Sequence, residues 1–472
     1  MVSNSSFIPS SIPRRQISSL AVLPLMNRTN DSDLELVSDG LTEALIRNLS
    51  RLPGITVKAR STVIMYKGKD VDPQDIGAAL SAQTILIGEL SRVNDVLKIQ
   101  LEVVDCKTRN LVWSGQFAGD ESDLVTLQNE IVGEVIENIY PSRTLSEQAP
   151  IGGNETKNDQ AYREYLRGRY YWNRRTVDDF KIAIIHFQNA IELDPDYALA
   201  YSGLSDSYRL LVSFSGMAPE DALPLAKATA LKALELNDGL AEAHASLSQV
   251  LSIDSGEERE LKRAIELDPN YATAIQWYAE LLCLEGRFDE ARVEIRHAIE
   301  LDPLSRMMKN IDARISVFAG RYDEAIVIGR KNIDLDPTWG EDHDLLFTAY
   351  AANGMYREAV DAYIMAWTLH KVMSPKEARD TKEAFAKGGW EGFLRHCLAD
   401  LETRSKREYV SPMMIAEFYS RLKQNDNAFQ CLDRALRTDP DSIGWLKYWP
   451  SFDNFRIDTR YDGLVRRYEH RT

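Results

Sequence analysis

A fixed spacing of residues through the middle of the chain limits the folds that it can adopt. The dipeptide Asp-Pro recurs at a spacing of 34 residues over 269–366, and so does the pattern Gly-x-aromatic-x-Glu-Ala between its copies. A period of this size indicates a solenoid, in which each repeat packs only against its neighbours. The recurring structural positions are Gly286, Ala291, Pro303, Gly320, Ala325, Pro337, Gly354 and Ala359.

Each repeat is predicted to be a hairpin of two helices. Residues 272–284 are apolar at helical spacing, and the glycine that follows suits the left-handed turn that often ends a helix. We expect a second helix over about 290–301, with the small Ala291 where the two helices approach closely. Proline after Asp302 ends this helix, because proline lacks a backbone N–H and restricts its predecessor. Such hairpins resemble tetratricopeptide repeats, which must stack to bury their apolar faces.

The repeat pattern continues less regularly on both sides of these three copies. We predict an array over residues 159–369, with a shortened or distorted hairpin near 252–256, where the glycine-aromatic turn is absent. Residues 370–405 lose the phase and are predicted as a divergent helical hairpin joined at Gly388–Gly389. Residues 406–472 restore one repeat and end in an aromatic stretch.

The aromatic stretch, which includes Trp445, Trp449 and Phe452, allows two interpretations. Terminal repeats need a cap, so the stretch can cover the open end of the last repeat. Aromatic side chains are also common anchors at binding surfaces, so the stretch can instead form a peptide-binding patch.

A different domain is predicted ahead of the array, over residues 18–140. Short apolar or alternating runs predict strands at 19–25, 55–59, 84–91, 96–104 and 110–117. Amphipathic runs predict helices at 41–52, 72–80 and 121–140, with an acidic loop at 31–35 before the first. Residues 1–17 are predicted to be a disordered leader, and 141–158 a polar linker. The expected fold class is α+β: a small mixed α/β amino-terminal domain, then an all-α superhelical solenoid.

Five short motifs occur in order in the amino-terminal domain: Leu20–Pro24, Asp39–Glu43, Tyr66–Asp72, Ile87–Leu90 and Leu111–Ser114. Together with the repeats, this order resembles bacterial tetratricopeptide proteins that carry a TolB amino-terminal-like domain, and the resemblance covers about residues 18–450. In those proteins the domain follows an amino-terminal effector, often a winged-helix DNA-binding domain or a class III nucleotide cyclase, usually with one membrane helix. The resemblance therefore implies the sensor or regulatory half of a signalling protein. The residues before Ser18 are too few for an effector, so we expect it to be absent here, and Met1 need not be the true start.

Charge and motif content narrow the function classes. A formal net charge of −16 argues against nucleic acid as a partner, because phosphate backbones require basic surfaces. The four cysteines are predicted to be buried thiols, and the seven histidines lack metal-ligand spacing. No phosphate-binding glycine loop or nucleophile motif is present. We therefore expect no catalytic residue, metal or cofactor. Without a long apolar run the chain is expected in the cytoplasm, or on the periplasmic side of the inner membrane if an upstream membrane helix is missing.

The sequence thus favours a non-enzymatic scaffold that binds a protein or peptide in a groove lined by the first helix of each repeat. The positions in phase with such a groove are Gln276, Asn310, Arg314 and Asp344. The alternative is the sensor or regulatory half of a regulator or cyclase, without its effector. Because an array of repeats often binds its own neighbours, we also expect that copies of this chain can self-associate.

Overall fold

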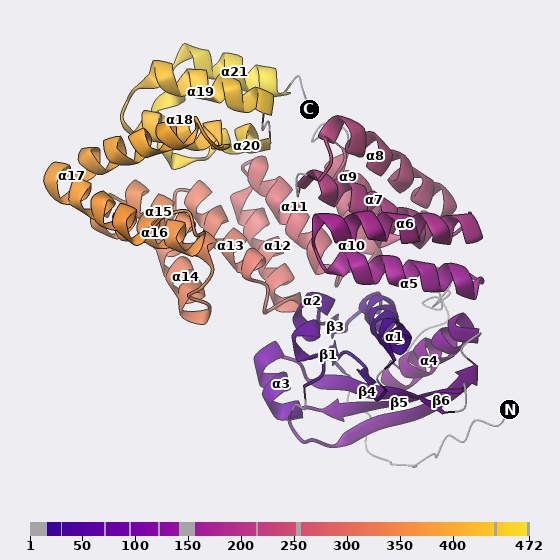
Figure 1. The fold of residues 1–472 in the computed structure, drawn as a ribbon. Coiled ribbons are helices and arrows are strands. Elements are labelled where there is room, and N and C mark those ends of the chain that lie inside the picture. Colours follow the sequence, from indigo (N-terminus) through magenta and orange to yellow (C-terminus); the bar gives the residue numbers. More distant parts are fainter. Residues whose placement is uncertain are drawn as a thin grey trace. The chain divides into compact units, whose positions relative to one another are not determined.

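The computed structural model describes residues 17–29, 31–69, 72–93, 96–120, 123–140, 156–213, 216–251, 256–438 and 441–469. The predicted leader, apart from Ile17, and most of the predicted linker lie outside these ranges. The chain forms two compact units. The first contains the residues up to Ile275 together with His297–Ser305, and the second contains Gln276–Arg296 and Arg306–Thr472. The predicted fold class is confirmed, because a mixed sheet with helices is followed by a long series of paired helices (Figure 1).

A six-stranded sheet forms the centre of the amino-terminal domain. Its strands are β1 (Ser19–Val22), β2 (Met26–Asn27), β3 (Thr56–Val57), β4 (Thr84–Val93), β5 (Val96–Asp105) and β6 (Leu111–Asp120). The order is β3-β1-β4-β5-β6, with β2 also paired to β4. Strand β1 is parallel to β3 and β4, whereas β4, β5 and β6 form an antiparallel meander. Alternate side chains of β5, including Leu97, Ile99 and Leu101, are buried, as expected for a strand with one face on the core.

Helices cover both faces of this sheet (Figure 1). They are α1 (Ser32–Ser50), α2 (Arg60–Val63), the 3-10 turn η1 (Ile64–Tyr66), α3 (Pro73–Leu80) and α4 (Leu124–Ile139). The predicted start of the first helix at residue 41 is wrong, since α1 begins at Ser32. Asp31 is its N-cap and accepts a hydrogen bond from the backbone N–H of Asp33. The predicted acidic loop is therefore mostly the first turn of α1, where carboxylates are favoured by the helix dipole.

Paired helices complete the first compact unit. They are α5 (Asp159–Asn173) with α6 (Val177–Leu193), α7 (Ala198–Ser213) with α8 (Pro219–Leu236), and α9 (Ala241–Ser248) with α10 (Glu257–Leu267). The third pair begins with the short helix α9, in agreement with the shortened hairpin predicted near 252–256. Residues 252–255 themselves lie outside the described ranges. Gly168 and Gly203 both face the ring of Phe187, and a Cβ at either position would lie 2.6 Å from that ring. These glycines let α5, α6 and α7 pack closely.

The regular repeats follow in the next six helices. These are α11 (Ala272–Leu284), α12 (Phe288–Leu301), α13 (Arg306–Phe318), α14 (Tyr322–Leu335), α15 (Gly340–Ala352) and α16 (Tyr356–Leu369). The turn glycines Gly286, Gly320 and Gly354 have φ of 80°, 72° and 74°, the left-handed conformation that disfavours other residues. The three repeat alanines are fully buried, and Pro303 and Pro337 each lie two residues beyond the end of a helix.

The carboxy-terminal part contains α17 (Pro375–Arg404), α18 (Pro412–Arg421), α19 (Asn425–Thr438), α20 (Asp441–Gly444), the 3-10 turns η5 (Trp445–Lys447) and η6 (Pro450–Phe455), and α21 (Thr459–Glu469). Gly389 breaks α17, with φ of 60° and ψ of −152°, at the junction predicted for a divergent hairpin. Phe452 and Phe455 are completely buried in a core that they share with Phe429 and Leu432. These two rings cover the last repeat. Within the described ranges, no helix combines the length and apolar character needed to cross a bilayer.

Candidate protein-binding surfaces

The four predicted groove residues all lie on first helices of the second compact unit, but they differ in availability. Asn310 is only 7% exposed, and its Nδ2 donates to Asp342 Oδ1 at 3.0 Å. Asn332 donates to the same oxygen at 3.2 Å. Because these bonds join α13, α14 and α15, Asn310 is a structural residue of the array and is not available as a groove contact.

The other three predicted residues remain nearer the surface. Arg314 Nη2 lies 2.7 Å from Glu280 Oε1, and Gln276 Nε2 reaches Glu280 only at 3.5 Å. Asp344 pairs with His370 at 2.7 Å, and its side chain is 46% exposed. A role of Gln276, Arg314 and Asp344 in partner binding stays a prediction.

An aromatic segment of the same chain, Trp445–Trp449, covers the surface around Arg314. The Trp445 ring stacks on Phe318 with centroids 5.3 Å apart, and the Arg314 guanidinium carbon lies 5.3 Å from the Trp445 centroid. The Tyr448 ring meets Phe288 edge-on at 5.0 Å. The tail thus makes two kinds of contact: Phe452 and Phe455 cap the last repeat, and the rings of Trp445–Trp449 lie on earlier repeats. Sequence reasoning left these roles as alternatives, since either suits an aromatic stretch.

A second surface lies within the first compact unit, where the α/β domain meets the repeats. The backbone N–H of Ala59 donates to Leu301 O at 2.9 Å, and Lys58 Nζ donates to Glu300 O at 2.7 Å. The hydroxyls of Ser61 and Thr62 both donate to the carboxylate of Asp302. The segment around α2 is therefore fixed to the end of α12.

The preceding repeat makes an equivalent set of bonds. Ser50 Oγ donates to Asp268 Oδ2 at 2.7 Å, and Asn270 Nδ2 donates to Ile55 O at 3.0 Å and to Ser50 O at 2.6 Å. Burial raises the pKa of Asp268 to about 6. The sequence indicated only that the Asp-Pro pairs end helices. Their second use is not visible in the pattern, because Asp336 has the same context and instead bonds Thr338 and Arg306.

A charged cluster in the first compact unit joins α1 to α2 and α5. Glu43 Oε1 lies 2.8 Å from Arg169 Nε, and Glu43 Oε2 lies 3.6 Å from Arg60 Nε. Burial by itself would raise the pKa of Glu43, but Arg169 and Arg60 hold it below its ordinary value. Arg169 and Arg175 both lie over the Trp172 ring, at 4.5 Å and 3.7 Å from its centroid. Cation–π contacts of this kind stabilise the junction. Among the described residues, no group of three or more His, Cys, Asp or Glu side chains could hold a metal ion.

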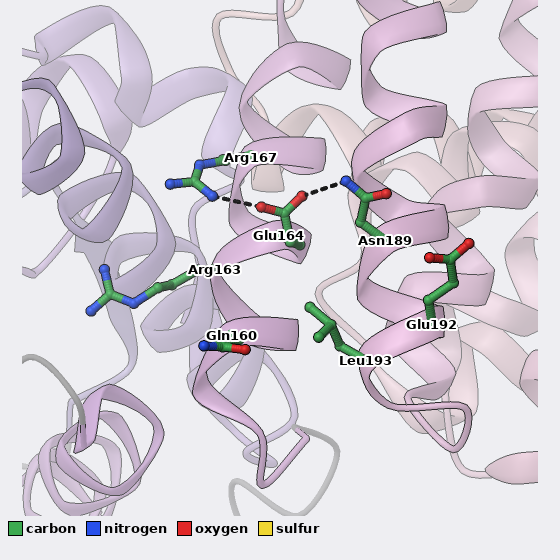
Figure 2. Close-up of a pocket in the computed structure, with 7 residues that line it drawn as sticks. All are labelled: Gln160, Arg163, Glu164, Arg167, Asn189, Glu192 and Leu193. Carbon is green, nitrogen blue, oxygen red and sulfur yellow. Dashed lines mark hydrogen bonds and ion pairs between the residues drawn. The ribbon is translucent and has the colours of Figure 1, made fainter.

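A pocket of about 610 Å³ lies between α5 and α6 in the first repeat (Figure 2). All of its lining residues except Leu193 have polar or charged side chains: they are Gln160, Arg163, Glu164, Arg167, Asn189, Glu192 and Leu193. Glu164 already accepts hydrogen bonds from Arg167 Nη1 at 2.6 Å and Asn189 Nδ2 at 3.0 Å (Figure 2). It is also 2.8 Å from His186 Nδ1. Because the chain itself uses this carboxylate, we assign no ligand to the pocket.

Known families match three segments of the chain. The family model for the second domain of HilA/YgeH-like transcriptional regulators matches residues 16–134. Tetratricopeptide repeat models match residues 260–293 and 413–442. The first match covers the domain that resembles the TolB amino-terminal-like domain, and it carries the name of a regulator.

Two kinds of individual protein are similar to this chain. "Putative adenylate cyclase 3" of Rhizobium meliloti (strain 1021) is 27% identical over 236 residues, which are 50% of this chain and 40% of that protein. The chain thus spans less than half the length of that relative. Among solved structures, yeast Tom70 is 14% identical, with 66% of this chain and 69% of that chain covered and a TM-score of 0.40. Pseudomonas aeruginosa pilF is 16% identical, with 56% and 99% covered and a TM-score of 0.33.

The family matches agree with the order of elements in the structure, with a sheet domain followed by stacked helical hairpins. The chain is a tetratricopeptide repeat protein with an amino-terminal HilA/YgeH-like regulator domain, and it has a distant homologue named as a putative adenylate cyclase.

Proposed function

We propose that this chain is the protein-binding, regulatory part of a bacterial regulator or cyclase-linked signalling protein, and that it is itself non-enzymatic. The repeats support protein binding, and the regulator domain and the cyclase relative support the signalling context. The observation that carries the proposal is the set of hydrogen bonds between segment 50–62 and the ends of α10 and α12. These bonds attach the regulator domain to two successive repeats.

The bonds offer a route from the repeats to the sheet. Each repeat contacts only its neighbours, so a partner that changes the packing of one repeat shifts the ends of the adjacent helices. Asp268 and Asp302 lie just beyond the last residues of α10 and α12. The segment that they hold includes β3, which pairs with β1 inside the sheet. A partner acts through this route only if it binds the two arrangements with different affinity.

A scaffold that captures a partner without relaying the event uses the same repeats. The sequence favoured this simpler function, and the regulator domain now favours the relay. The two functions differ in what happens to the α/β domain when the partner binds.

Photo-crosslinking in the source cell identifies the partner, and hydrogen exchange on the purified full chain then separates the two functions. In the wild type, we expect the rate of hydrogen exchange in residues 55–63 to differ between the free chain and the chain with its partner bound. The variant Asp302→Ala should bind the partner and lose this response. The matched control Asp336→Ala removes the equivalent aspartate, which contacts Thr338 and Arg306, and should keep the response.

Two results would contradict the proposal. Exchange in residues 55–63 of the wild type that does not change when the partner binds would leave only the scaffold function. The absence of any crosslinked partner that binds the purified chain would remove protein binding altogether.

A further inference from the structure

The aromatic segment that lies on the earlier repeats has the form of a short binding motif. The backbone N–H of Trp449 donates to Trp445 O at 3.1 Å, so residues 445–449 make one helical turn. Trp445, Tyr448 and Trp449 have i, i+3, i+4 spacing, which brings side chains to one face of such a turn. Trp445 and Trp449 both contact Phe318, with centroids 5.3 Å and 5.4 Å apart.

The polar groups of the surface beneath are held by other residues of that surface. Arg314, which lies over one of the rings, is fixed by Glu280 at 2.7 Å. Glu417 accepts a hydrogen bond from Trp449 Nε1 at 3.2 Å and is itself fixed by Arg421 at 2.7 Å. Because the repeats position these groups independently of the segment, the surface is preorganised for an aromatic ligand.

The contact is shared only in part with the cap on the last repeat. Phe452 and Phe455 are completely buried in the core of that repeat, and the partly exposed Trp449 also packs against this core. Trp445 and Tyr448 are partly exposed and contact Phe318 and Phe288 of earlier repeats. These two rings therefore form a contact in addition to the cap. Trp, Tyr and Arg are also the residue types that most often dominate the binding energy of protein interfaces.

We propose that the surface formed by Phe288, Arg314, Phe318 and Glu417 binds a helical protein segment with Trp or Tyr at i, i+3 and i+4, and that residues 445–449 occupy it as an intramolecular ligand. This rests on the proposed function, because it names the kind of partner that the repeats bind. A tethered ligand acts at an effective concentration on the order of 1 mM. A partner segment must therefore displace the turn.

The test uses the full chain and a fluorescent peptide with the sequence of residues 443–456. Binding is measured by anisotropy to the wild type and to a variant in which Trp445, Tyr448 and Trp449 are replaced by Ala. The variant should bind the peptide, and the wild type should bind on the order of 10- to 100-fold more weakly because its site is filled. Adding Arg314→Ala and Phe318→Ala to the variant should abolish binding.

Two results of the peptide test would overturn the proposal. One is equal binding to the wild type and the triple variant. The other is no binding to a folded triple variant, since the rings would then belong to the cap alone.

If the triple variant does not fold, Gly286→Ala and Gly320→Ala give a matched pair. Both positions have left-handed φ, but only a Cβ at 286 would meet the Tyr448 hydroxyl, at 2.7 Å. Hydrogen exchange of residues 443–456 should rise in Gly286→Ala alone, and an equal effect in the pair would overturn the proposal.

The peptide test and the relay test fail independently. The first depends on the surface around Phe318, and the second depends on Asp302. A negative peptide result with an intact response at residues 55–63 would move the partner to another surface and leave the proposed function standing.

Discussion

Replacing Glu43 by Gln tests whether the charged cluster holds the α/β domain to the repeats. Glu43 lies 2.8 Å from Arg169, and the two side chains are only 17% and 20% exposed. The amide keeps the shape of the side chain but removes the charge, so Arg169 and Arg60 lose their shared carboxylate. Removing one partner of a buried ion pair typically costs about 3–5 kcal/mol. Because both side chains keep some exposure, we expect a loss of about 2–3 kcal/mol in the free energy of unfolding.

Urea unfolding of the first compact unit measures this loss. With a slope of about 1–3 kcal/mol per molar urea, the midpoint should fall by roughly 1 M. A chain with several cooperative parts does not unfold in one step. The urea midpoint of this unit is therefore best determined from the hydrogen exchange of peptides from α1 and α5. The pKa of Glu43 is lowered, so its stabilisation is present above the ordinary carboxyl pKa and is lost only as pH falls through the lowered value. The defect should therefore be constant between pH 6 and 8.

A matched control is the exposed pair of Glu89 and Arg28, whose charged atoms are 2.7 Å apart. Its side chains are about half exposed, so Glu89→Gln should cost only roughly 0–1 kcal/mol. If Glu43→Gln shifts the midpoint no more than Glu89→Gln, the cluster does not stabilise the junction, and this reasoning is refuted.

Three further changes test other parts of the structure. The pKa of Asp268 is raised from 3.8 to about 6, so the native state binds the proton more tightly and stability should fall as pH rises between these values. Asp268→Asn should flatten that slope in urea midpoints, and an unchanged slope would contradict the assignment. Phe452→Ala should cost about 3–5 kcal/mol and speed hydrogen exchange in α18 and α19, whereas Ile457→Ala, at a residue 90% exposed, should change neither. Ala325→Leu should cost about 1–3 kcal/mol, measured by thermal unfolding, because the larger side chain overpacks a fully buried position of α14. Val327→Leu, at an exposed position of the same helix, should be neutral.

Local patterns predicted most of the helices and strands. The turn glycines and small alanines of the repeats carry their own physical reason, since a left-handed φ and a close helix approach restrict the residue type. The kink at Gly389 follows for the same reason. In contrast, β2 and α2 are too short for any periodicity, and the start of α1 depends on one cap at Asp31.

The binding surfaces could be predicted only in part. Phase along the repeat placed Asn310 and Arg314 on the first helix of one repeat, but phase does not tell which of them is buried. The residues that fasten the α/β domain were missed, since Ser61 and Asp302 are 241 positions apart. Such pairs depend on how two folded parts meet, and a single sequence holds no local signal for that.

The three repeat aspartates bear on the proposed relay. Asp268, Asp302 and Asp336 have the same local sequence role, but Asp268 and Asp302 bind the α/β domain, whereas Asp336 binds Arg306. The domain therefore bridges two consecutive repeats, with Ser50 on one and Thr62 on the next. Hydrogen bonds tolerate only a few tenths of an ångström before they weaken, so a change in the spacing of these two helix ends must strain one set of bonds or the other. A domain attached at a single repeat would not respond to such a change. In the proposed relay, attachment at two repeats would transmit such a change from the array to the sheet.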